Sequence, residues 1–212
     1  MDLASQSCKG DEPDFEHWIE AVKKSQKLNR LMAKPMWDSK DFRHWISLGM
    51  PVCADVEHLY INDIDIEIIP PEISNLHFLR SLEISAPKIS VIPPEIGELS
   101  KLCELCINDT NIYTIPSEIG KLINLRSLHL QDNYITELPI EIVNLNNLKE
   151  LHLSGNCIEC FSSELCNLPS ECDVYVDKYI ADIISKEMNI SFNLYFTQGR
   201  AKSADTKPAY RV

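Results

Sequence analysis

A 23-residue repeat constrains this chain more than any other feature. Leu79, Leu102, Leu125 and Leu148 follow one another at that constant step, and Val56 lies one step earlier. Each unit has apolar residues at its first, fourth and sixth positions, then an Asn-like position, two apolar positions and, in four of the five units, a proline. A unit this short cannot bury its apolar side alone, so the units must stack into a solenoid.

The apolar-x-apolar core of each unit predicts a short strand of a parallel sheet. Side chains alternate along a strand, so Leu128 and Leu130 should point inward while Ser127, His129 and Gln131 face the concave surface. The Ile-Pro-x-Glu-Ile segments of the units should form the convex side as short helical turns. We expect their proline at the first helical position, where its fixed φ is favourable.

The Asn-like position predicts a ladder of side-chain hydrogen bonds between units. Asn133 and Asn156 can each bond the backbone of a neighbouring turn, and Thr110 is a plausible substitute. Pro87 and Ile64 cannot make that bond, so the first two units should turn less regularly.

The segment before the repeats predicts two amphipathic helices that cap the sheet. The pattern of Asp14–Ile19 recurs once, at Asp41–Ile46. Apolar residues at helical spacing continue from the first copy to Leu31 and stop at Pro35. A cap hides the open edge of the first strand, but the aromatic residues of this segment could instead bind a partner. The tryptophans concerned are Trp18, Trp37 and Trp45.

The repeat register continues once beyond the fifth unit. Val174 and Val176 occupy inward strand positions, and apolar residues from Tyr179 to Met188 then follow helical spacing, which predicts a closing helix. The last residues are short of apolar side chains and should be disordered. We therefore predict a helical N-terminal cap at 1–55, five repeats at 56–170, a strand and capping helix at 171–196 and a disordered tail at 197–212.

The charge of the chain argues against nucleic acid as a partner. The net charge is −12, and residues 56–170 hold 17 acidic against 6 basic residues. Such a surface repels phosphates and favours a basic protein surface. No apolar run approaches the roughly 20 residues of a membrane helix, and the N-terminus lacks the layout of a secretory signal. We therefore expect a cytoplasmic protein whose eight cysteines stay reduced.

Ile92–Leu99 has the sequence Ile-Pro-Pro-Glu-Ile-Gly-Glu-Leu, and its neighbours repeat it. In this motif and its 23-residue period, residues 56–168 resemble the leucine-rich repeats of the cytoplasmic Ras-group type. The resemblance implies an α/β solenoid with a curved parallel sheet on its concave face, and protein binding on that face. Similar repeats occur in signalling scaffolds and bacterial effector proteins. The resemblance does not specify the partner.

Projecting the register onto the concave face gives the predicted protein-binding site. Its residues stand in columns across adjacent strands, which lie about 4.8 Å apart. The face is polar with few aromatic anchors, which suggests a modest or transient interface. The predicted site residues are His58, Tyr60, Glu83, Glu104, Cys106, His129, Gln131, Glu150 and His152.

Metal binding and catalysis are the alternative interpretation of the same columns. Cys106, His129 and His152 share one column, flanked by Glu104 and Glu150, and these residue types suit zinc. Ligands about 4.8 Å apart on a rigid sheet do not readily converge, however. A nucleophile also needs an enclosed pocket with an orienting group, which an open sheet does not supply. We therefore expect no metal, no cofactor and no enzymatic activity.

The C-terminus carries one further short motif. Tyr210-Arg211-Val212 has an apolar last residue and another two before it. PDZ domains accept such ends by strand addition and carboxylate capture. The sequence therefore allows a PDZ contact through the tail.

Overall fold

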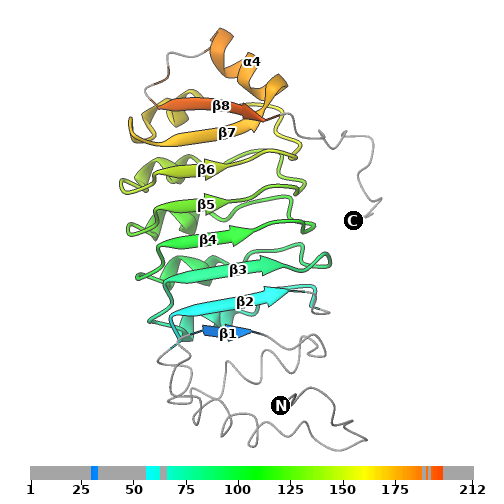
Figure 1. Ribbon diagram of the computed structural model, residues 1–212, viewed down its shortest axis with the longest axis vertical. Helices are drawn as coiled ribbons and strands as arrows, with labels where there is room; N and C mark the ends of the chain where they lie inside the picture. The colour runs from blue at the N-terminus through cyan, green and yellow to red at the C-terminus, as the bar shows by residue number, and fades with distance from the viewer. Residues whose placement is uncertain (1–29, 33–55, 63–65, 188–189, 191, 198–212) are drawn as a thin grey trace, which may run out of the picture.

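The computed structural model describes residues 30–32, 56–62, 66–187, 190 and 192–197. The described strands form one parallel sheet of eight strands in chain order, stacked one above the next with short helical turns behind them (Figure 1). This architecture confirms the α/β solenoid predicted from the 23-residue step. The strands are β1 (Arg30–Met32), β2 (His58–Asn62), β3 (Ser81–Ser85), β4 (Glu104–Ile107), β5 (Ser127–His129), β6 (Glu150–His152), β7 (Asp173–Asp177) and β8 (Asn193–Thr197).

The register of the sheet follows the sequence repeat from β2 to β7. His58 lies opposite Ser81, and each further partner is one 23-residue step on, as far as Asp173 opposite Glu150. Leu128 and Leu130 are fully buried, whereas the alternating side chains, such as that of His129, are half-buried. The inward and outward positions are therefore those that the apolar pattern predicts.

Five 3-10 helices, one per repeat, line the convex side of the described solenoid. Here the structure confirms one expectation in the first two units, where Pro71 and Pro94 take the first helical position. It corrects that expectation for the proline that recurs in four units, which lies at the N-cap. Pro93, for example, has φ −72° and ψ 147°, an extended conformation that its ring permits, and Pro94 takes the first helical position. The helices are η1 (Pro71–Asn75), η2 (Pro94–Glu98), η3 (Ser117–Lys121), η4 (Ile140–Asn144) and η5 (Ser163–Asn167).

The predicted ladder of asparagine hydrogen bonds joins the later repeats. Asn133 Nδ2 donates to the carbonyls of Ile107 at 2.7 Å and Leu130 at 3.0 Å. Asn156 Nδ2 donates to the Leu130 carbonyl at 2.7 Å. The Thr110 N–H donates to Asn133 Oδ1 at 3.2 Å, and the Thr110 hydroxyl donates to the same oxygen. Thr110 therefore joins the ladder by donating to the asparagine of the next repeat, while Ile64 lies outside the described residues.

The two ends of the sheet differ from the expectation. The helical pattern extended to Leu31, but Arg30–Met32 form strand β1, which pairs with β2. The predicted cap helices otherwise lie outside the described residues. At the other end strand β8, which includes Thr197, pairs with β7, so the sheet has one more strand here than predicted.

The predicted closing helix does form, in the part of the chain that connects β7 to β8. Helix α4 (Lys178–Glu187) packs Ile180 and Ile184 into the core, which agrees with the helical spacing of its apolar residues. Among the described helices, none has both the length and the apolar character that crossing a membrane requires.

Candidate functional site

The concave face brings the predicted site residues together in two neighbouring columns. Every second strand residue faces outward, and the 23-residue register places equivalent positions side by side. Gln131 lies just beyond the end of β5. The first column holds His58, Glu104 and Glu150, and the second holds Tyr60, Glu83, Cys106, His129 and His152.

A continuous stack of four rings runs along the second column, and we call it the ring stack. His129 and His152 have their centroids 4.2 Å apart, His152 and Tyr175 4.1 Å apart, and Tyr175 and Tyr195 5.0 Å apart. The interplanar angles are 18°, 8° and 18°. The two tyrosines were absent from the predicted site. Tyr175 could have been found, because it lies one 23-residue step beyond His152, whereas Tyr195 comes from the unpredicted strand β8.

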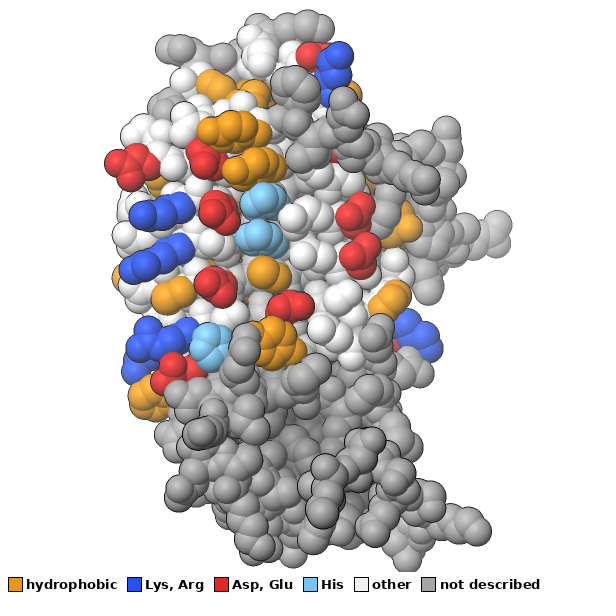
Figure 2. All heavy atoms as spheres, viewed as in Figure 1, with side chains coloured by type: hydrophobic (Ala, Val, Ile, Leu, Met, Phe, Trp, Pro, Cys, Tyr) orange, Lys and Arg blue, Asp and Glu red, His pale blue; other side chains and the backbone are white. Residues whose placement is uncertain are grey.

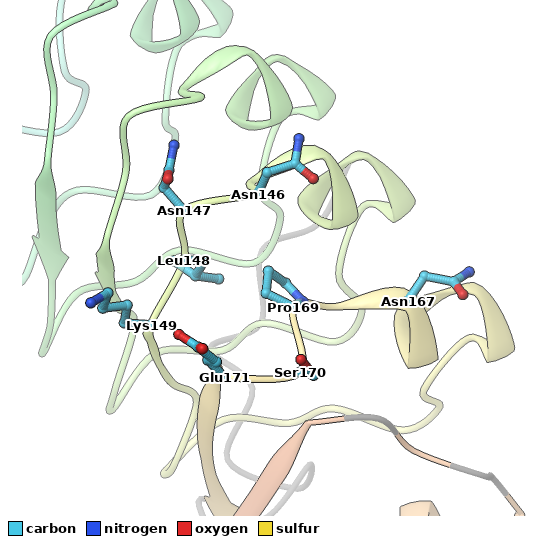
Figure 3. A pocket seen from close by; sticks show the side chains of 8 residues that line it. All are labelled: Asn146, Asn147, Leu148, Lys149, Asn167, Pro169, Ser170 and Glu171. Atoms are coloured by element: carbon cyan, nitrogen blue, oxygen red, sulfur yellow. The ribbon is translucent and has the colours of Figure 1, made fainter.

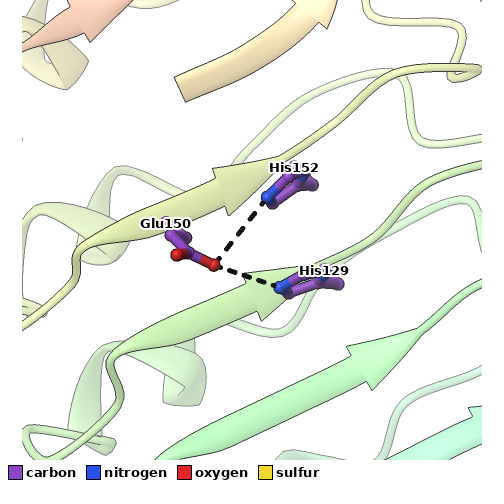
Figure 4. Close-up of side chains that lie close together, drawn as sticks. All are labelled: His129, Glu150 and His152. Carbon is purple, nitrogen blue, oxygen red and sulfur yellow. Dashed lines mark ion pairs between the residues drawn. The ribbon is translucent and has the colours of Figure 1, made fainter. Parts of the chain in front are cut away.

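Carboxylates line one side of the ring stack. Glu150 Oε2 lies 3.7 Å from His129 Nε2 and 4.0 Å from His152 Nε2, and both imidazoles turn that nitrogen toward the carboxylate (Figure 4). Burial and the neighbouring His129 lower the pKa of His152, and Glu150 opposes them. The His152 imidazole is therefore held toward its neutral form, although a carboxylate stands beside it.

A row of basic residues borders the carboxylates, so the face is not uniformly acidic. Arg80, Arg126 and Lys149 are exposed and precede the first column on β3, β5 and β6. They form a blue edge beside the red carboxylates in Figure 2. At this edge Arg80 Nε forms an ion pair with Glu57 Oε2 at 3.4 Å. Both side chains are partly exposed, so this pair adds little to stability.

Cys106 is a poor candidate for nucleophilic or metal chemistry. Burial, together with Glu83 and Glu104, raises the pKa of its thiol to about 11. The reactive and metal-binding form of cysteine is the thiolate, so Cys106 is almost wholly in the unreactive form at neutral pH. Among the described residues, His129, Glu150 and His152 instead form a cluster whose ligand atoms all lie within 4.8 Å of one another.

A shallow pocket of about 420 Å³ lies outside the two columns, on the turns that lead into β6 and β7. Its lining is mainly amide, hydroxyl and charged groups, and these side chains do not converge on one point (Figure 3). It therefore lacks the apolar walls typical of a small-molecule site. The lining residues are Asn146, Asn147, Leu148, Lys149, Asn167, Pro169, Ser170 and Glu171.

Comparisons with known proteins identify the repeats. Residues 123–168 match the family model described as Leucine Rich repeats (2 copies). No curated protein matches the chain.

Solved structures share the fold. A leucine-rich repeat protein of Leptospira interrogans is 31% identical over 58% of this chain and 32% of its own, with a TM-score of 0.50. The leucine-rich repeat domain of the type III effector XopL is 29% identical over 59% of this chain and 44% of its own, with a TM-score of 0.56. The chain thus spans less than half the length of either structure.

Proposed function

We propose that this chain, whose repeats match the leucine-rich repeat model, is a protein-interaction module that binds its partner on the concave face. One observation carries the proposal: a column of carboxylates runs beside the ring stack on a rigid sheet. Aromatic rings that are fixed by stacking lose little conformational entropy on binding, which suits them as anchors. The fold supports protein binding in general, and the face and the partner are our proposal.

The charges of the face favour a partner with a basic surface. Glu104, Glu150 and Asp173 stand in one column. Glu150 and Asp173 lie beside the ring stack and Glu104 beyond its first ring, and all three would pair with lysine or arginine side chains. The basic edge formed by Arg80, Arg126 and Lys149 favours acidic residues at the border of that same surface. Complementary charges of this kind raise the association rate and fix the orientation of the partner.

A pull-down with matched variants tests the proposal. The first variant replaces Glu104, His129, Glu150 and His152 by alanine. The control variant replaces exposed residues outside the strands, His77, Glu98 and Glu137, by alanine. We expect the wild type and the control to retain the same partner and the first variant to lose it, while all three unfold at the same denaturant concentration. A partner list unchanged in the first variant would contradict the proposal and favour the tryptophan-rich N-terminal segment.

The setting in which the module acts is also a proposal. The similarity to the repeat domain of XopL, a type III effector, supports a role as an effector-like protein or a signalling scaffold. That role corresponds to the cytoplasmic location expected from the sequence. A PDZ contact through the C-terminus stays a prediction, because residues 198–212 lie outside the described part of the chain.

A further inference from the structure

We propose that His129, Glu150 and His152 form a binding site for one divalent transition-metal ion of the zinc class. The sequence alone argued against metal, because ligands on adjacent strands of a rigid sheet need not converge. The structure supplies the missing observation: both imidazoles direct Nε2 toward the same carboxylate oxygen, at 3.7 Å and 4.0 Å (Figure 4). The site lies within the proposed partner-binding face, but the proposal of a metal ion does not require that a partner binds there.

Two of the three distances between the ligand atoms are close to those of a coordination sphere, and all three are within 4.8 Å. In a tetrahedral zinc site, with metal–ligand distances of about 2.0 to 2.1 Å, ligand atoms lie about 3.3 Å apart. The two Nε2 to Oε2 distances exceed this value by less than about 1 Å. Because the two rings are 18° from parallel, they must tilt for both lone pairs to meet one ion. Because His152 is also stacked on Tyr175, this tilt falls mainly to the His129 ring.

The chemistry of the donors selects the metal. Two imidazole nitrogens and one carboxylate oxygen suit zinc, copper and nickel, whereas calcium and magnesium prefer oxygen donors alone. Metal binding requires both imidazoles in their neutral form.

The surroundings leave one side of the site open. His129 and His152 remain partly exposed, with 25% and 22% of their side-chain surfaces accessible. Tyr175 stacks on His152 from the other side and limits the movement of that ring. Structural zinc sites have four protein ligands. Three protein ligands with water in the fourth position are typical of catalytic zinc sites.

A zinc titration of the full chain, without any partner, tests the site. Calorimetry on metal-free protein should show one equivalent of zinc, and millimolar calcium or magnesium should not compete. The double variant His129→Asn/His152→Asn should bind at least about tenfold more weakly, and Glu150→Gln should weaken binding in the same direction. The matched control is His58→Asn, which removes an imidazole from the same face outside the cluster and should bind like the wild type.

Cobalt provides a second readout, because its visible absorption reports coordination geometry. Cobalt-loaded wild type and His58→Asn should share one spectrum, and the double variant should lose it. No zinc binding by the wild type, or equal binding by the double variant, would overturn the proposal. If the double variant fails to fold, Glu150→Gln decides alone, since it keeps both rings and the size of the side chain. Partner capture is measured separately, so failure of the metal site leaves the proposed function standing.

Discussion

Replacing Asn133 by alanine should destabilise the solenoid more than any change on its concave face. The side chain is fully buried. Its Nδ2 donates to the Ile107 carbonyl at 2.7 Å, and its Oδ1 accepts the Thr110 N–H at 3.2 Å. Alanine leaves both backbone groups without this partner in the core. At about 1 to 3 kcal/mol for each buried group that loses its partner, the free energy of unfolding should fall by about 2 to 6 kcal/mol.

Asn147 provides a matched control for this loss. Its Nδ2 also donates to a carbonyl of the preceding repeat, that of Ile123 at 2.7 Å, but the bond is exposed to solvent. Water replaces an exposed hydrogen bond, so Asn147→Ala should change the free energy of unfolding by no more than about 0.5 kcal/mol. The two substitutions thus remove the same chemical group and differ mainly in burial.

Urea denaturation followed by circular dichroism measures both changes. The slope against urea should stay the same for both variants, since each keeps the fold. Hydrogen exchange adds a local readout, because the Thr110 amide should lose protection in Asn133→Ala beyond what the loss of global stability explains. Equal destabilisation by Asn133→Ala and Asn147→Ala would refute the argument that burial of the ladder determines its contribution.

Three further predictions follow from packing and from titration. Leu128→Ala should lower the free energy of unfolding by about 2 to 5 kcal/mol and Gln131→Ala by almost nothing; equal melting temperatures would contradict the register. Cys106, with its pKa raised to about 11, should be alkylated at pH 8 far more slowly than the exposed Cys160, as peptide mass spectrometry would show. Burial raises the pKa of Tyr179 to about 12 in the folded chain, so folding favours the neutral phenol. Stability should therefore fall as the pH rises from about 10 toward 12, and Tyr179→Phe should weaken that dependence in alkaline denaturation curves.

The regular part of the fold could be predicted because one period determines it. The 23-residue step places each strand residue beside its equivalent from β2 to β7. The two ends break that step. Arg30 lies opposite His58, at a separation longer than the step, and Asn193 lies opposite Asp173, at a shorter one. A search by period therefore misses both β1 and β8, and with β8 the last ring of the stack, Tyr195.

The sequence pattern predicted the position of the recurring proline wrongly by one residue, because it does not determine the backbone angle ψ. A fixed φ near −70° fits the first turn of a helix as well as an extended N-cap. The two positions differ in ψ, which the proline ring does not fix. The recurring proline adopts the extended value, as at Pro93 with ψ 147°. Sequence pattern alone carries no information on that angle.

The columns of the candidate site were predictable, but their chemistry was not. Register determines that His129 and His152 are neighbours, and strand spacing alone suggests two donors too far apart to share an ion. Whether the two donors can share an ion depends on the side-chain rotamers. These bring the ring centroids to 4.2 Å and turn both Nε2 atoms toward Glu150. Adjacent strands of the repeat lie about as far apart as stacked rings do. Each ring can therefore pack on the next without bending the sheet, so stacking the rings causes little strain. The repeat period therefore predicts the backbone of the site. The chemistry of the site depends on side-chain torsion angles, which the period does not determine.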